Sequence, residues 1–220
     1  MDQRCGRFWK LQESVIFHTD NDDHDHSNDS QEPMLWLDGL DFPLVQALHQ
    51  VMQERYSERR QPIEKSSEEV MDKLGASFGH GAPLADFFHY KWRDTEKALY
   101  ELIKSPAARD RFDGYLLQYR NPLTKGPTMT TIQCAVQLLL PSDETETHRH
   151  TSTVIYHVFR GAGATQIGER RFDWEQGDSF VVPLWYAHRH LNRSSSEDAI
   201  LFSMSDAPVL KALDLYREEF

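Results

Sequence analysis

The segment THRHTSTVIYHVFRG, residues 147–161, is the most informative part of the sequence. Two histidines, His148 and His150, stand two residues apart just before an alternating apolar run. Side chains at positions i and i+2 of a strand project from the same face. If the segment is extended, both imidazoles point to one place, so the spacing predicts a strand that offers two metal ligands.

A second segment, GDSFVVPLWYAHRHLN at residues 177–192, also carries a pair of histidines. A Gly-Asp turn and a proline bound one strand, and His188 and His190 begin the next. The third ligand of a site around the first pair has to come from a different strand, and His188 is the candidate. Three neutral imidazoles suit Fe(II), Zn, Mn or Cu, and ligand type alone does not choose among these metals.

Short alternating apolar runs fill the chain after Phe112, a pattern typical of a β-sandwich of about 100 residues. Glycines and prolines separate the runs. In one of them Cys134 and Val136 alternate with Ala135 and Gln137, which predicts a strand buried on one face only. The runs are GYLLQYRN (114–121), TIQCAVQLLLP (131–141), TSTVIYHVFRG (151–161), ATQIG (164–168), ERRFDW (169–174), DSFVVP (178–183), AHRHLN (187–192) and DAILFSMSD (198–206).

Helical patterns flank the β region. Apolar residues recur at helical spacing over residues 43–52, where the initial proline is tolerated in the first turn. A second helix is predicted over residues 92–103 with Asp94 as its N-cap, and a third over residues 208–219. Residues 33–40 are strand-like, and residues 61–84 predict a linker with a short helix near 68–74.

Acidic residues are concentrated near the N-terminus. The net charge is −11, and residues 11–54 hold ten acidic residues but neither Lys nor Arg. Residues 18–31 are so polar and acidic that residues 1–30 are predicted to be poorly ordered. The rest of the chain has no basic stripe for a phosphate backbone, which excludes nucleic-acid binding.

Hydropathy and cysteine content bear on the compartment. No apolar run reaches the roughly 18–20 residues of a membrane span, so no membrane association is expected. The first residues lack the apolar stretch of a signal peptide. Two cysteines, Cys5 and Cys134, cannot form a disulfide framework and suit a reducing compartment, which predicts a cytoplasmic protein.

The two histidine segments together resemble the two conserved motifs of the cupins. The first motif has the HxH pair and the turn glycine Gly161, and the second has Gly177, Asp178 and Pro183 before its histidine. The cupin pattern has a glutamate a few residues after HxH, where this chain has Val154. The resemblance implies a mainly β cupin, a double-stranded β-helix or jelly roll with flanking α-helices, and a three-histidine site.

Three-histidine cupins of this kind resemble the gentisate 1,2-dioxygenase family, with its salicylate and 1-hydroxy-2-naphthoate dioxygenases. Further strings carry the resemblance: PMLWLDGLDFPLVQAL (33–48), YRNPLTKGPTMTTIQC (119–134) and LFSMSDAPVLKALDLYREE (201–219). Family members have a complete cupin before the WLDGLD link, so this chain resembles the C-terminal half of a bicupin. A truncated gene, a shifted start and a natural single-cupin relative would look alike. The expected parts are a disordered segment or remnant of a first cupin (1–33), a strand, helices and linker (34–110), and a cupin with its C-terminal helix (111–220).

The resemblance implies an Fe(II)-dependent, extradiol-type ring-cleaving dioxygenase that acts on a hydroxylated aromatic acid with O2, converting gentisate to maleylpyruvate. Tyr156 stands where many first-cupin sites of the family have an arginine for the substrate carboxylate. Arg149 is the alternative partner, although it alternates away from the ligand face. The implied residues are the metal ligands His148, His150 and His188, the acid/base residue His190, and the substrate contacts Tyr156, Trp185 and Arg149.

A second reading is a catalytically inactive, truncated metal-binding cupin with a structural or oligomerisation role. The intact histidine triad favours the enzyme, whereas the missing first cupin and Tyr156 favour the inactive module. In either case the apolar residues around Trp36 and the helix face of Leu44 lack an obvious partner, so a homo-oligomer is expected.

Overall fold

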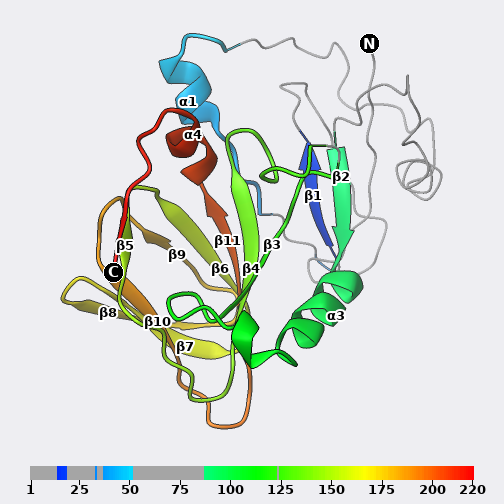
Figure 1. Cartoon of the computed structure of the whole chain (residues 1–220), viewed down its shortest axis with the longest axis vertical. Coiled ribbons are helices and arrows are strands. Elements are labelled where there is room, and N and C mark those ends of the chain that lie inside the picture. The colour runs from blue at the N-terminus through cyan, green and yellow to red at the C-terminus, as the bar shows by residue number, and fades with distance from the viewer. Residues whose placement is uncertain (1–13, 19–32, 34–36, 52–86, 123) are drawn as a thin grey trace. The chain divides into compact units, whose positions relative to one another are not determined.

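The computed structural model describes residues 14–18, 33, 37–51, 87–122 and 124–220 (Figure 1). The described residues before Asp94 and those from Asp94 to Phe220 form two separate units. None of the described helices is long and apolar enough to cross a membrane. The sequence-based division at residues 33/34 and 110/111 stays a prediction.

The described part of the N-terminal unit has one strand pair and one short helix. Strand β1 (Ser14–His18) pairs antiparallel with β2 (Phe87–Lys91), so the prediction of poor order is wrong for these residues of the 1–30 segment. The rest of that segment, Trp36 and the predicted helix at 68–74 lie outside the described residues. Residues 37–40 form no strand, which corrects the strand-like reading of this part of 33–40.

Helix α1 (Phe42–Ala47) confirms the predicted helix but ends well before residue 52. His49 adopts a left-handed conformation with φ 56°. The amide of Gln50 then donates to the Val45 carbonyl at 3.1 Å, and that of His49 to the Gln46 carbonyl at 3.0 Å. This pair of bonds is the Schellman pattern that terminates a helix.

The C-terminal unit is built on a five-stranded antiparallel sheet. Its order is β3-β4-β11-β6-β9. The strands are β3 (Tyr115–Gln118), β4 (Gln133–Leu139), β11 (Ala199–Ser205), β6 (Val154–Arg160) and β9 (Ser179–Val182). Each corresponds to one of the apolar runs, which confirms the prediction that these runs are strands.

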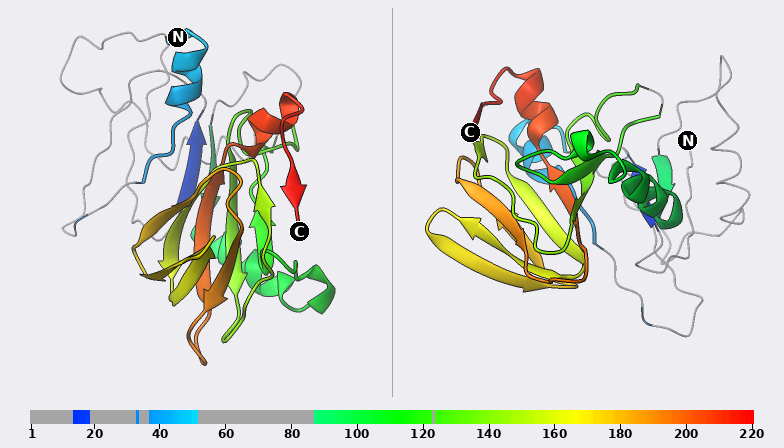
Figure 2. Two further views of the ribbon diagram at one scale, coloured as in Figure 1. Left: turned by 90° about the vertical axis from the view of Figure 1, so that its left-hand side faces the viewer. Right: turned by 60° about the horizontal axis from the view of Figure 1, so that its bottom comes forward.

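A second sheet faces the first (Figures 1 and 2). It contains β10 (His188–Asn192), β7 (Ala162–Ile167) and β8 (Arg170–Glu175). The segment ending in β5 (Arg149–His150) runs beside β10 through isolated bridges. The core between the sheets consists of Leu139, Val154, Tyr156, Val158, Ile167, Trp174, Val182, Ala199 and Leu201. This is the mainly β cupin jelly roll that was expected.

Helix α3 (Trp92–Leu102) is linked to strand β6 of the large sheet by the Arg160–Glu96 ion pair at 2.8 Å. Leu99 is fully buried, and the Tyr119 hydroxyl donates to Thr95 Oγ1 at 3.3 Å. Strand β4 is therefore buried along nearly its whole length on both faces, and the expectation of one exposed face is wrong. The helix begins at Trp92, so Asp94 lies in its first turn and is not the N-cap. A single 3-10 turn, η1 (Pro106–Ala108), leads back towards the sheet.

The C-terminal helix is shorter than predicted. Helix α4 (Ala207–Ala212) gives way to Asp214 in a left-handed conformation with φ 56°. The Leu215 amide donates to the Leu210 carbonyl at 2.7 Å, a second Schellman ending. The chain then turns back, and β12 (Glu218–Glu219) pairs antiparallel with β5. The prediction of a helix to residue 219 is thus wrong after Ala212.

Candidate metal centre

Two neighbouring segments bring His148 and His188 directly opposite each other. The two residues exchange backbone hydrogen bonds of 3.1 and 2.8 Å, and their ring centroids are 4.3 Å apart. The ring of His150 lies 5.4 Å from His148 and 5.0 Å from His188. One ligand atom from each of the three rings lies within 4.8 Å of the others. The i, i+2 spacing and the bridge between segments thus gather three buried imidazoles.

Backbone carbonyls orient two of these rings. His150 Nδ1 lies 2.9 Å from the Ser152 carbonyl, and His188 Nδ1 lies 3.0 Å from the Tyr186 carbonyl. Because a carbonyl can only accept, each Nδ1 carries the proton and each Nε2 keeps a free lone pair. His188 Nε2 is buried without a partner. This is the arrangement in which imidazoles bind a metal.

The protonation of the cluster also suits a metal. Burial lowers the pKa of His148 to about 3, and the nearby His188 and His150 lower it further. Burial likewise lowers the pKa of His188 to about 4 and lowers that of His150. All three rings are therefore neutral at pH 7, and no proton has to leave before a divalent ion binds. Among the described residues this is the one such cluster of potential ligands, and it fits a metal ion bound by three histidines.

His190 lies beside the cluster but is not part of it. Its ring is fully buried, 5.7 Å from that of His188. Trp174 Nε1 donates to Thr165 Oγ1 at 2.9 Å, and Thr165 Oγ1 lies 2.9 Å from His190 Nδ1. When the hydroxyl accepts from the indole and donates its own proton to Nδ1, the imidazole proton is on Nε2. That Nε2 has no partner.

Tyr156 forms part of the interior wall next to His190. Its ring stacks on Phe180 at 5.1 Å and meets the edge of His190 at 4.8 Å. Burial raises the pKa of its hydroxyl well above the usual value, with smaller effects of Asp113 and Tyr216 in the same direction. Tyr156 is thus a neutral phenol inside the jelly roll. Its role as a substrate contact stays a prediction.

Arg149 and Trp185 lie on the other side of β5. The Arg149 guanidinium makes two bonds to the Glu219 carboxylate, at 2.7 and 2.8 Å, and lies 4.8 Å from the centre of the Trp185 ring. Arg149 alternates away from the imidazoles of its neighbours, as the strand period requires. The structure therefore does not bring these two side chains together with the histidines, and their substrate role stays a prediction.

Gln137 is a candidate that the sequence analysis missed. It pairs with Leu201 of the core on the neighbouring strand and so faces the interior. It is 1% exposed, and both its amide nitrogen and its amide oxygen lack a hydrogen-bond partner. An unpaired buried amide costs about 1–3 kcal/mol, which is rarely kept without a use. A polar residue on the interior face of a core strand was the available signal.

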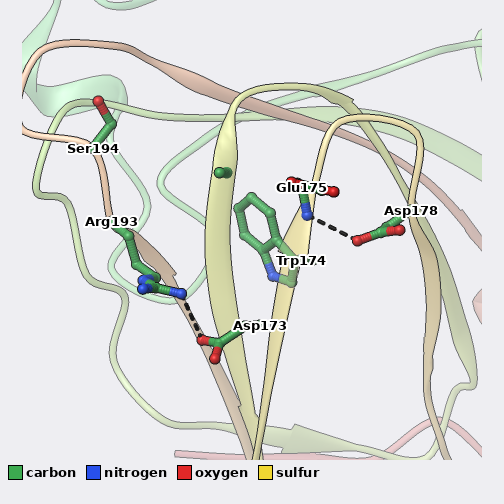
Figure 3. Close-up of a pocket in the computed structure, with 7 residues that line it drawn as sticks. Asp173, Trp174, Glu175, Asp178, Arg193 and Ser194 are labelled. Carbon is green, nitrogen blue, oxygen red and sulfur yellow. Dashed lines mark hydrogen bonds and ion pairs between the residues drawn. The ribbon is translucent and has the colours of Figure 1, made fainter.

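A hollow away from the histidines is lined by residues of β8 and of the segments that follow β8 and β10 (Figure 3). Its lining includes Trp174, Glu175 and Asp178, and Arg193 pairs with Asp173 at 3.0 Å. The Asp178 carboxylate accepts from the Glu175 amide at 2.9 Å within the turn. Arg193, Asp173 and Asp178 thus have local partners, and no histidine lines this hollow. The imidazole cluster is the better candidate site.

Comparison with known proteins agrees with this geometry. The family model described as "Cupin domain" matches residues 135–205. The chain is 38% identical over 204 residues to 5-aminosalicylate 1,2-dioxygenase from Comamonas sp, covering 89% of this chain and 53% of the relative. It is 36% identical to gentisate 1,2 dioxygenase 1 from Aquipseudomonas alcaligenes, covering 89% of this chain and 56% of the relative.

The chain belongs to the gentisate and salicylate 1,2-dioxygenase family. Salicylate 1,2-dioxygenase from Pseudaminobacter salicylatoxidans superposes with a TM-score of 0.70 at 29% identity, covering 87% of this chain and 57% of the enzyme. The same enzyme has been crystallised as adducts with gentisate. The chain spans about half the length of the relatives that it matches.

Proposed function

We propose that the chain binds Fe(II) through His148, His150 and His188 and uses it to cleave the ring of a hydroxylated aromatic acid with O2. The observation that carries this proposal is the cluster of three buried, neutral imidazoles whose ligand atoms lie within 4.8 Å of one another. The family relatives are 1,2-dioxygenases of gentisate, 5-aminosalicylate and 1-hydroxy-2-naphthoate. Extradiol-type cleavage of gentisate to maleylpyruvate is therefore the first reaction to test.

Three imidazoles leave coordination positions open, so bound Fe(II) would activate both the aromatic acid and O2 there. The chain's contribution is geometry. The carbonyls of Ser152 and Tyr186 fix the ring orientations of His150 and His188, and the bridge between the two segments fixes His148 against His188. Such a preorganised ligand set needs little rearrangement when the ion binds.

His190 is the proposed acid/base residue. The bonds from Trp174 to Thr165 and from Thr165 to Nδ1 leave the proton on Nε2, and among the described residues this nitrogen has no partner. Burial, followed by the nearby imidazoles, lowers its pKa well below the usual value, so the ring is neutral. A neutral N–H donor beside the metal ligands can hold a substrate hydroxyl or an oxygen atom and exchange a proton with it.

Gln137 is the proposed polar contact for the substrate. Its amide offers two donors and one acceptor, none of which is paired within the described chain. A carboxylate or hydroxyl group of an aromatic acid would satisfy them. The aromatic rings of Tyr156 and Phe180 supply an apolar wall for a flat ligand.

One observation favours the second candidate, a metal-binding cupin without ring cleavage. No Lys or Arg is buried among the described residues, and Arg149 is held by Glu219. Within the described residues a substrate carboxylate therefore lacks a buried cation partner. In this reading the cupin binds metal and serves a structural or oligomeric role.

Oxygen consumption separates the two candidates. The Fe(II)-loaded chain is mixed with gentisate, salicylate, 5-aminosalicylate or 1-hydroxy-2-naphthoate, and O2 is followed with an electrode. We expect stoichiometric O2 uptake with at least one acid, lost in His188→Ala and retained in Glu144→Gln, which changes an exposed ion pair on the neighbouring Arg189. Bound iron without O2 uptake on any of the four acids would favour the structural module.

A further inference from the structure

The C-terminal segment lies against strand β5, which carries His150 and directly follows His148 (Figures 1 and 2). In the β12–β5 pair, Glu218 is opposite His150 and Glu219 is opposite Arg149. The Thr151 amide donates to the Arg217 carbonyl at 2.9 Å, and the Arg217 amide donates back to Thr151 Oγ1 at 2.9 Å. The segment thus adds an edge strand next to the metal site.

Aromatic side chains of this segment reach the imidazoles from outside. The Tyr216 ring lies nearly parallel to that of His150, with centroids 6.5 Å apart. Phe220 stacks on Phe112 at 4.5 Å, and Phe112 contacts the ring of His148 at 5.1 Å. From Lys211 to Phe220 only Tyr216 is half-buried, while the other residues are exposed. The segment therefore covers the site through a single inward ring and one stacked terminal ring.

The contacts that hold the segment are few and exposed to solvent. The Arg149–Glu219 pair is solvated, with side chains 37% and 57% exposed, and Phe220 is 70% exposed. Exposed ion pairs and two-residue strands add little stability. At its start, Asp214 ends helix α4 in a left-handed conformation, a natural pivot. Such a segment can leave without disturbing the two sheets.

We propose that residues 213–220 are a strap that closes the metal site and swings away about Asp214 to admit metal and substrate. The Arg149–Glu219 ion pair, next to the Trp185 ring, holds the strap closed. The closed strap places the Tyr216 ring beside that of His150. The proposal rests on the metal site of the proposed function but not on ring cleavage. It gives Arg149 and Trp185 a role on the outer side of β5.

The first test measures metal release. The chain is loaded with Co(II), mixed with excess EDTA, and the loss of the Co(II) absorption is followed. Glu219→Gln is expected to speed release roughly two- to fivefold, the range for losing an exposed ion pair. Deletion of residues 214–220 should speed it further. The matched control is Glu144→Gln, since Arg189 lies between His188 and His190 as Arg149 lies between His148 and His150, and its pair with Glu144 is similarly exposed.

Equal release rates for Glu219→Gln, Glu144→Gln and the unmodified chain would overturn the strap, as would a chain that binds no Co(II). If the deletion variant does not fold, Glu219→Gln still decides. If Glu219→Gln releases Co(II) faster while the Fe(II)-loaded chain takes up no O2, the strap is supported and the proposed ring cleavage is contradicted.

Amide hydrogen exchange on the metal-free chain gives a second readout. The Thr151 amide is bonded to the strap, whereas the His148 amide is bonded to His188 in the sheet. We expect Thr151 to exchange at least tenfold faster than His148 and to exchange faster still in Glu219→Gln. Equal protection of the two amides would show that the strap does not open.

Discussion

Gln137 carries the clearest prediction at the level of a single residue. Gln137→Leu removes a buried amide that has no partner, so the free energy of unfolding should stay unchanged or rise by about 1–2 kcal/mol. Binding of an aromatic acid to the metal-loaded chain should weaken roughly tenfold, because one hydrogen bond to the ligand is lost. Denaturant unfolding and calorimetric titration measure the two effects.

Gln133→Leu is the matched control on the same strand. Its amide nitrogen donates to the Tyr119 carbonyl at 2.8 Å, so this change should lower stability without altering ligand affinity. A Gln137→Leu variant that loses stability while binding the acid normally would contradict the assignment of Gln137 as a substrate contact.

The buried histidines predict how stability depends on pH. The pKa values of His148 and His188 are about 3 and 4 in the folded chain, below the unfolded value near 6.5. As pH falls below 6.5, these histidines are protonated in the unfolded chain but stay neutral in the folded chain. The unfolded chain is therefore stabilised relative to the folded chain. Asp113, whose pKa burial raises to about 7, acts in the opposite direction but is a single group.

The two histidines should therefore cost the metal-free chain roughly 4 kcal/mol of unfolding free energy between pH 6.5 and 4.5, since each pH unit is worth ~1.4 kcal/mol per histidine. Asp113 offsets about 2 kcal/mol of this, so a net loss of roughly 2 kcal/mol is expected. Denaturant titrations at both pH values test this. A stability that is flat or rises towards pH 4.5 would show that the histidines are not held neutral.

Among the strands, β7 shows how tightly the small sheet is built. A Cβ on Gly163 would lie 2.2 Å from the Leu191 carbonyl oxygen and 2.3 Å from the Trp174 ring. Gly163→Ala should cost at least about 2–3 kcal/mol, because the backbone of β10 or the buried indole must move. Thermal unfolding measures the loss. Gly126→Ala, where the nearest atom is a flexible threonine hydroxyl at 3.3 Å, should be nearly neutral; equal effects of the two changes would contradict the packing.

The strands of the jelly roll could be predicted from the sequence, because their alternation is local. The C-terminal ends of helices α1 and α4 could not, whereas that of α3 was predicted to within one residue. Both α1 and α4 stop at a left-handed residue that is not glycine, His49 and Asp214, so the usual C-terminal signal is absent. The apolar periodicity continues past both residues, and the predicted helices overran. Strand β12 was missed because its partner β5 lies about 70 residues away in the sequence.

The same contrast holds for the candidate site. The HxH pair and the second motif identified the three imidazoles that the structure brings together. The orphaned amide of Gln137 and the strap with Tyr216 depend on contacts between distant segments, which no spacing reveals. Arg149 and Trp185 were predicted as substrate contacts. In the structure the Arg149 guanidinium bonds to Glu219 and lies over the Trp185 ring.

For the whole molecule, we propose a homo-oligomer. Described apolar residues before Asp94 are exposed, including Leu40, Phe42 and Leu48, the last at 60%. Such surface is usually covered by another chain. Sedimentation at micromolar concentration should give a dimer or larger species, and Trp36→Asp or Leu48→Asp should dissociate it. A clean monomer of the unmodified chain would rule this out.

Metal stoichiometry tests the central claim most directly. The metal-free chain is titrated with Fe(II) under anaerobic conditions, and bound iron per chain is counted. The account predicts one Fe(II) per chain, lost in His150→Ala because two imidazoles hold a divalent ion weakly. Iron should be retained in His157→Ala, because His157 is not one of the three ligands. Its Nδ1 lies 3.0 Å from Ser179 Oγ. Unchanged iron content in His150→Ala, or no bound iron in the unmodified chain, would contradict the account.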